Sequence, residues 1–152
     1  MKPSINLLIT VVLILLLLPA TVQSQNNESN IKKVVFGSYS FKSSKTKEYT
    51  INSHREVLYT DRLDKKLSLI GELSKSDTKK LFRTLNESSI LSVNLNKPGR
   101  DYYFIELINE DNSKHRIVWE SNPGKEVEDI YNYLEDIVTS ISSSNETQAI
   151  SK

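Results

Sequence analysis

The chain has 152 residues, with 20 Lys and Arg against 19 Asp and Glu, and it contains no cysteine. This near-neutral balance gives no net electrostatic attraction to nucleic acid. The absence of cysteine excludes a disulfide scaffold, a thiol nucleophile and attachment through an N-terminal lipidated cysteine. We therefore expect no nucleic-acid partner.

The first 24 residues have the pattern of a secretory signal peptide. Lys2 supplies a positive charge, Ile5–Leu18 is an apolar run, and the small residues Val22 and Ser24 precede a polar segment. Cleavage after Ser24 makes Gln25 the first residue of the mature chain. The sequence thus predicts export to the periplasm or the extracellular medium.

An uncleaved membrane anchor is the alternative for the same segment. A spanning helix needs about twenty apolar residues, whereas this run is interrupted at Asn6 and Thr10 and stops at Pro19. Cleavage is therefore favoured, and we expect no membrane insertion of the mature chain.

Removal of residues 1–24 leaves 128 of the 152 residues, which is enough for one domain with its own core. Residues 25–30 are polar without periodicity and residues 142–152 are mostly polar, so both segments are predicted to be disordered. A single α+β domain is expected over 31–141. Asn-X-Ser/Thr sequons, which matter only if a eukaryote secretes the chain, occur at Asn27, Asn86 and Asn145.

Charge is distributed unevenly along the chain. Residues 32–100 hold fifteen Lys and Arg against seven acidic residues, while residues 101–152 hold four against eleven. One interpretation is a basic surface for an anionic partner, and the other is two halves that neutralise each other in the fold. Lys79, Lys80 and Arg83 fall where a helix would present a solvated face, which favours the second interpretation.

Short runs of β-branched and aromatic residues predict strands in the first part of the domain. Val34–Phe36 is the first, and Glu48–Ile51 and Glu56–Thr60 form a hairpin around Asn52–Arg55. Leu67–Ile70 is either another short strand or an extended approach to the next helix.

A helix is predicted to begin after Ser74, because Ser74 can cap it and Asp77 can answer in the acidic form of a capping box. The helix should end near Asn86–Ser89. Residues 92–100 are expected to be loop, with the Pro98–Gly99 order suiting a type II turn. The buried face is expected to hold Thr78, Leu81, Phe82 and Leu85.

The clearest local pattern is a second hairpin, in which Tyr102–Ile108 and His115–Trp119 flank the polar Asn109–Ser113. The opposite side of its first strand is also apolar, which indicates a central strand or a partly covered second face. The buried side is predicted to contain Tyr103, Ile105, Leu107, Ile117 and Trp119.

The last helix is predicted to have Asn122 as its cap and Pro123 at its first position, followed by acidic residues near the positive end of the helix dipole. Its apolar face is expected to pack on the sheet. That face comprises Val127, Ile130, Tyr131, Leu134, Ile137, Val138 and Ile141. The element order βββαββα predicts an α+β fold in which two helices pack on one face of an antiparallel β-sheet, as a two-layer sandwich.

No catalytic, metal-binding or cofactor-binding residue is predicted, and no cofactor is expected. His54 in a turn and His115 on a strand lack metal-ligand spacing, and no G-x-S-x-G motif surrounds a serine. Carboxylate pairs such as Glu126 and Asp129 are expected to be solvated charges on the last helix, outside the dry cleft that acid/base pairs need.

Several stretches of the chain together resemble a known group of proteins. They are Leu-Ser-Lys-Ser-Asp at the first helix start, Pro-Gly-Arg-Asp-Tyr-Tyr at 98–103 and Ile-Val-Trp at 117–119. Over about residues 33–140 the chain resembles a family of small, uncharacterised exported proteins from Bacteroidetes-type bacteria. The order of its elements is more distantly similar to emfourin, a proteinaceous inhibitor of thermolysin-like metalloproteases. Those relatives are Gly-rich after the first strand, where this chain has Gly37–Lys42, so no inhibitory residue is carried over.

The sequence therefore favours a non-catalytic binding domain with a protein partner, and the emfourin resemblance implies a secreted metalloprotease as one class of partner. Tyr39 and Phe41 are candidate aromatic anchors, unless both rings simply pack into the sheet. The alternatives are an envelope-associated small-ligand-binding protein or an unrecognised enzyme, and either needs a concave pocket with convergent polar groups. The predicted partner-binding residues are Ser38, Tyr39, Ser40, Phe41 and Lys42.

Overall fold

The computed structural model describes residues 30–61 and 66–150. The predicted signal peptide and the sequon at Asn27 lie outside the described residues. In chain order the elements are β1 (Ile31–Ser40), β2 (Lys45–Asn52), β3 (Glu56–Asp61), β4 (Lys66–Glu72), α2 (Lys75–Glu87), the 3-10 helix η1 (Ser89–Ser92), β5 (Asn96–Lys97), β6 (Asp101–Asn109), β7 (Lys114–Trp119) and α3 (Lys125–Ile150).

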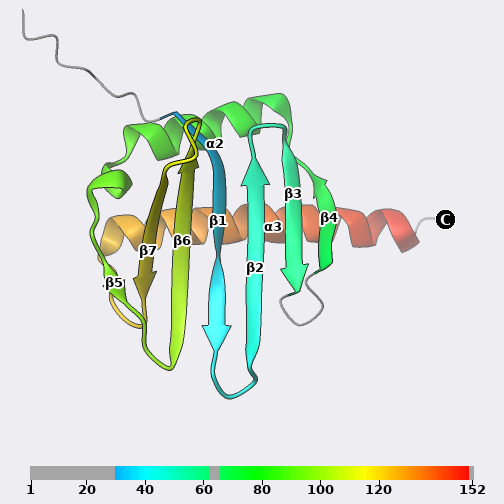
Figure 1. The fold of residues 1–152 in the computed structure, drawn as a ribbon. Coiled ribbons are helices and arrows are strands. Elements are labelled where there is room, and N and C mark those ends of the chain that lie inside the picture. Colours follow the sequence, from blue (N-terminus) through cyan, green and yellow to red (C-terminus); the bar gives the residue numbers. More distant parts are fainter. Residues whose placement is uncertain (1–29, 62–65, 151–152) are drawn as a thin grey trace, which may run out of the picture.

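The fold is mixed α+β, with a seven-stranded sheet and two α-helices in the described chain (Figure 1). The strand order is β4-β3-β2-β1-β6-β7-β5. All neighbouring strands are antiparallel except β5, which runs parallel to β7. The central strands β1 and β6 pair along most of their length.

The predicted order βββαββα is wrong at two places. The run Leu67–Ile70 is a strand, because β4 pairs with β3 and adds a fourth strand before the first helix. β5 lies within the predicted loop and consists of Asn96 and Lys97, which pair with Val118 and Trp119. Two polar residues carry no strand periodicity, so only the position of β7 beside them makes them a strand.

One face of the sheet supplies most of the core. Phe36 on β1 lies opposite Ile105 on β6, and Val34 lies opposite Leu107. All four side chains are fully buried. The same core contains buried residues of α2 and α3, and Figure 1 shows both helices behind the strands. Alternation along β1 and β6 therefore places one apolar row toward the helices.

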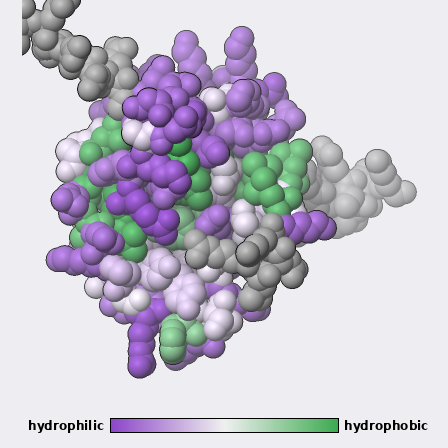
Figure 2. Space-filling model, in the orientation of Figure 1, coloured by the Kyte–Doolittle hydropathy of each residue, from purple (hydrophilic) through white to green (hydrophobic). Residues whose placement is uncertain are grey.

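The other face of the sheet is polar over much of its area, with separate apolar patches (Figure 2). Phe104 is nevertheless only 1% exposed there. The guanidinium of Arg116 lies 4.6 Å from the centroid of the Phe104 ring. Arg116 and Lys114 each approach Glu106 to 3.2 Å. This ion-paired group covers the second apolar side of β6, which the sequence had indicated as partly covered.

A close backbone approach occurs at Gly37 on β1. A Cβ at this position would lie 1.9 Å from the carbonyl oxygen of Lys47 on the neighbouring strand. The φ of Gly37 is also +156°, a value that side chains rarely allow. Only glycine fits here, in the middle of a strand that pairs on both sides.

Helix α2 has the start and the buried face that the sequence predicts. The Ser74 hydroxyl accepts a 3.1 Å hydrogen bond from the Asp77 backbone N–H and donates to the Asp77 carboxylate at 2.6 Å. This closes the helix N-terminus as a variant of the capping box, in which the Asp77 carboxylate accepts from the Ser74 hydroxyl and not from its backbone N–H. The buried residues of α2 are Thr78, Leu81, Phe82 and Leu85.

Helix α3 begins at Lys125, two residues beyond the predicted Pro123. Asn122 and Gly124 both have positive φ values, +45° and +91°, so the chain turns sharply before it becomes helical. Val127, Ile130, Leu134 and Val138 are buried, while Tyr131, Ile137 and Ile141 pack partly buried against the core. The helix continues to Ile150, through most of the segment expected to be a polar tail.

No helix within the described ranges is both long and apolar enough to cross a membrane.

Candidate functional site

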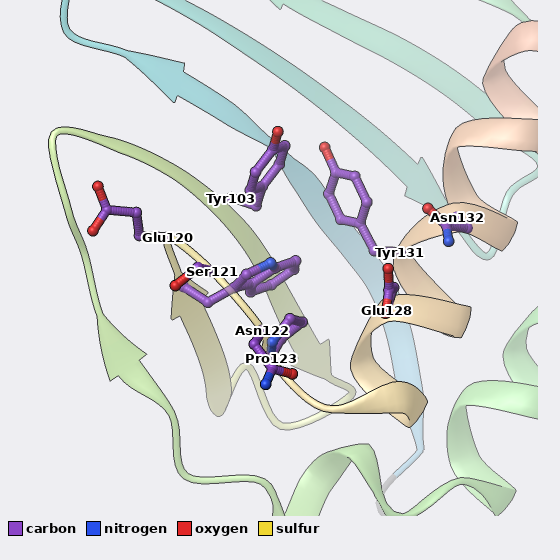
Figure 3. Close-up of a pocket in the computed structure, with 9 residues that line it drawn as sticks. Tyr103, Glu120, Ser121, Asn122, Pro123, Glu128, Tyr131 and Asn132 are labelled. Carbon is purple, nitrogen blue, oxygen red and sulfur yellow. The ribbon is translucent and has the colours of Figure 1, made fainter.

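A cleft of about 300 Å³ opens where β6, β7 and the start of α3 meet (Figure 3). We call it the aromatic cleft. Its lining residues are Tyr103, Trp119, Glu120, Ser121, Asn122, Pro123, Glu128, Tyr131 and Asn132. Three consecutive elements, together with the turn between β7 and α3, therefore contribute to one concave surface.

The apolar part of the aromatic cleft is a group of three rings in mutual contact. Tyr103 stacks on Trp119 with centroids 5.9 Å apart and planes 24° apart. Tyr131 meets both rings edge-on, at centroid distances of 5.5 Å and 5.4 Å. Such edge-to-face and stacked pairs stabilise aromatic groups beyond the area they bury. The three rings form a rigid platform.

Tyr103 is the exposed member of this platform. It is 43% exposed, whereas Trp119 is 5% exposed. The expectation that Tyr103 would be buried is therefore wrong. Strand alternation does place it on the same face as Ile105 and Leu107, and its register partner Trp119 belongs to the core, but the Tyr103 ring itself stays open to solvent.

Two of the residues that line the aromatic cleft carry carboxylates. Glu128 lies on α3 one turn before Tyr131, and Glu120 follows Trp119 directly. Figure 3 shows the Glu120 carboxylate directed away from the rings. That carboxylate occupies the space that a Cβ at Gly99 would fill. Gly99 also lacks the positive φ that the third residue of a type II turn needs. The type II turn predicted at Pro98–Gly99 is therefore wrong.

A third carboxylate holds the hydroxyl of Tyr131. The Tyr131 Oη donates a 2.9 Å hydrogen bond to Glu135 one turn further along α3. Burial, together with the negative charge of Glu135 and this hydrogen bond, raises the pKa of Tyr131 far above its ordinary value of 10.0. Burial and Glu135 also raise the pKa of Tyr49. Both hydroxyls thus stay protonated and neutral at physiological pH.

The aromatic cleft also contains polar groups. Its hydroxyl and amide groups come from Ser121, Asn122 and Asn132, which can donate and accept hydrogen bonds. The aromatic cleft thus combines flat apolar faces with hydroxyl, amide and carboxylate groups.

The predicted partner-binding residues lie at the same end of the sheet. Ser38, Tyr39 and Ser40 end β1, and Phe41 and Lys42 begin the turn to β2. Ser38 is the register partner of Tyr103. The hairpin tip therefore lies two strands away from the Trp119 side of the aromatic cleft.

Within the predicted segment, Tyr39 and Phe41 have different surroundings. Tyr39 stacks on Tyr102 with centroids 5.2 Å apart, and it is only partly exposed. Phe41 is 58% exposed. The Phe41 backbone N–H donates a 2.9 Å hydrogen bond to Asp101, and the Arg100 guanidinium lies 5.6 Å from the centre of its ring. Phe41 is thus an exposed ring on an anchored turn.

Sequence reasoning missed the residues of the aromatic cleft as a site. Trp119 and Tyr131 were assigned to the core, and Glu128 to the solvated first turn of the last helix. One available signal was the sole tryptophan of the chain, followed directly by the polar turn Glu120–Pro123. Trp is enriched at interfaces because its ring combines a large apolar surface with a polar N–H.

A second cleft, of about 340 Å³, lies between the two helices. It is lined by Leu73, Asp77, Lys80, Tyr133, Asp136, Ile137 and Ser140. Burial, followed by the charge of Asp77, raises the pKa of Tyr133. This cleft carries charges of both signs and a single ring, so it offers a partner less distinctive chemistry than the aromatic cleft.

The uneven charge of the chain is partly resolved by local pairing. Arg55 lies 3.2 Å from Glu72, and Glu106 pairs with Lys114 and Arg116. These pairs form within one half of the sequence, not between the halves. The candidate basic residues of α2 are exposed: Lys75, Lys79, Lys80 and Arg83.

His54 lies in the β2–β3 turn and His115 on β7, as the sequence predicts. No group of three or more His, Cys, Asp or Glu side chains suited to a metal ion occurs in the part of the chain that the structure describes. Comparison with known proteins finds no family model that matches this chain and no similar curated protein.

Proposed function

We propose that this chain is an exported, non-catalytic binding domain that recognises a protein partner with one end of its sheet. We define this binding end as the aromatic cleft together with the Phe41 turn. The signal-peptide pattern of residues 1–24 supports export. The proposal includes the two-layer arrangement, in which α2 and α3 form the layer behind the sheet.

The observation that carries the proposal is the exposure of Tyr103 on a rigid aromatic platform. Exposed Tyr and Trp side chains with fixed surroundings contribute most of the energy at many protein interfaces, because little conformational entropy is lost on binding. Phe41 provides a second exposed ring, 58% accessible, on the hairpin whose register places Ser38 opposite Tyr103. Two such rings at one end favour a macromolecular partner.

A secreted metalloprotease is the partner class that the emfourin resemblance suggests. To test this, the purified protein is added to a thermolysin-like protease and the residual protease activity is measured. Stoichiometric inhibition that is lost on Tyr103→Ala or Phe41→Ala would support an inhibitory role. Undiminished activity at a large excess of the domain would remove proteases of this type from the candidates.

The general test is capture of partners by the purified protein from the periplasmic and secreted fractions of the producing cell. We expect Tyr103→Ala and Phe41→Ala each to reduce retention of a stoichiometric protein at least about tenfold, as loss of an interface anchor does. Leu69→Ala is the matched control, because Leu69 is also 58% exposed but lies on β4 at the edge of the sheet.

Circular dichroism and thermal unfolding must show that each variant remains folded. Retention that is unchanged by Tyr103→Ala and Phe41→Ala would refute the binding end. Retention of small molecules in place of any protein would favour the small-ligand alternative, for which the aromatic cleft has a suitable size.

A further inference from the structure

The aromatic cleft also indicates which chemical group of a partner it binds. This inference rests on the proposed function and concerns the same site. Among its described lining residues are two carboxylates, Glu128 and Glu120, of which Glu120 is directed away from the rings (Figure 3), and none is Lys, Arg or His. Glu135 adds a third negative charge behind Tyr131. The electrostatic potential of the cleft therefore favours a cation.

The ring geometry distinguishes between two ways of binding a cation. An ammonium group is enclosed most effectively by rings that surround it, each with its face about 6 Å or less from the charge. The rings of Tyr103, Trp119 and Tyr131 lie 5.4 to 5.9 Å from one another. They fill the space between themselves, so a cation can bind only on the outer surface of the platform.

A planar cation suits an outer aromatic surface. The guanidinium of arginine stacks on an aromatic face and directs its N–H groups sideways, toward carboxylates at the rim of that face. Tyr103 supplies the exposed ring and Glu128 the carboxylate beside the platform. Phe41 with Arg100 is an example of such a contact between ring and guanidinium within the same chain, at 5.6 Å.

We propose that the aromatic cleft binds an arginine side chain of the partner protein, with the guanidinium stacked on Tyr103 and paired with Glu128. A partner with a neutral or acidic group at this position would leave the carboxylates without a counter-charge. Arginine is also one of the residues most enriched among interface anchors, together with Tyr and Trp.

The test is a titration of the purified protein with three short blocked peptides, Gly-Arg-Gly, Gly-Lys-Gly and Gly-citrulline-Gly. Trp119 is the only tryptophan of the chain, so its fluorescence reports on this cleft. We expect the arginine peptide to change the emission saturably, with at least about tenfold weaker binding of the citrulline peptide, which has the same shape without the charge. The lysine peptide should bind between these limits.

Glu128→Gln tests the assigned carboxylate, and Glu110→Gln is its control, because Glu110 is exposed in the turn at the other end of β6. Only Glu128→Gln should weaken binding of the arginine peptide. Three results would overturn the proposal: equal binding of the citrulline or lysine peptide, equal effects of the two substitutions, or no emission change with any peptide.

Failure of this inference is distinct from failure of the proposed function. If capture of a partner depends on Tyr103 but the peptides bind without regard to charge, the binding end stands and its preference for arginine is wrong. If capture is independent of both Tyr103 and Phe41, the binding end itself is wrong, whatever the peptides show.

Discussion

The side-chain oxygen of Asn86 accepts a 3.2 Å hydrogen bond from the backbone N–H of Ile31, a residue 55 positions earlier in the chain. The amide nitrogen of Asn86 donates a 2.8 Å hydrogen bond to the carbonyl of Phe82, one turn earlier in α2. Asn86 thus connects the last turn of α2 to the first residue of β1. One of the three sequons therefore has a structural role that its pattern did not reveal.

Asn86→Ala is expected to lower the free energy of unfolding by about 1–2 kcal/mol, because the Ile31 N–H loses its acceptor in a partly buried position. Urea unfolding followed by Trp119 fluorescence measures the change as a lower midpoint. Asn94→Ala, at an exposed position, is the control and should change stability by less than about 0.5 kcal/mol. Equal stability of the two variants would contradict a role for the Ile31 contact.

Gly37→Ala combines a steric clash with an unfavourable φ, whereas Gly124→Ala introduces the unfavourable φ alone. At Gly37 the added Cβ would lie 1.9 Å from the Lys47 carbonyl oxygen, whereas at Gly124 nothing lies within 4 Å and only the φ of +91° is unfavourable. We expect Gly37→Ala to cost more than about 3 kcal/mol or to prevent folding, and Gly124→Ala to cost about 1 kcal/mol. Thermal unfolding of both variants checks this order, and a reversed order would refute it.

The raised pKa of Tyr131 predicts a loss of stability at alkaline pH. An unfolded tyrosine ionises near its ordinary value of 10.0, while the folded Tyr131 keeps its proton. Unfolding then releases a proton, so this contribution is fully present below pH 10.0 and declines as the pH rises above it. Tyr131→Phe should make the free energy of unfolding less dependent on pH in this range.

The measurement for Tyr131→Phe is denaturant unfolding of both proteins at several values between about pH 7 and pH 11. The stability difference between them should be constant near neutrality and decrease above pH 10.0. A difference that stays constant over the whole range would show that Glu135 and burial do not hold the proton on Tyr131.

Ser74→Ala tests the capping box of α2. The Ser74 hydroxyl is the acceptor for the Asp77 N–H at 3.1 Å, and loss of such a cap costs about 1 kcal/mol. Ser140→Ala is a matched control in the exposed middle of α3, where alanine is the better helix former and stability should stay equal or rise slightly. Destabilisation by Ser140→Ala of the same size would argue against a specific effect of the cap.

Local chemistry made much of the fold predictable. The cap at Ser74 and the apolar spacing of α2 depend only on neighbouring residues, so both the start of the helix and its buried face were predicted correctly. The two hairpins were recognisable because their strands alternate and flank short polar turns. β5 was not predictable in this way, because two polar residues form a strand only beside β7.

The candidate site depends on tertiary structure, and the sequence therefore indicated it only in part. Phe41 was predicted as an aromatic anchor, and the structure places it on an exposed turn, although its binding is untested. Tyr103 follows the alternation of a buried strand face and touches Tyr131 of α3, yet its ring stays 43% exposed. No local sequence pattern predicts its contact with Tyr131, because the two residues are far apart in the sequence.

Helix α3 follows every strand in the chain, yet it supplies Val127, Ile130, Leu134 and Val138 to the core. The central strand β1 likewise pairs with β6, which is synthesised much later. Native contacts over such separations slow folding, since the intervening chain must be brought together before they form. The core of the emerging polypeptide is therefore incomplete until the chain has been synthesised as far as Val138.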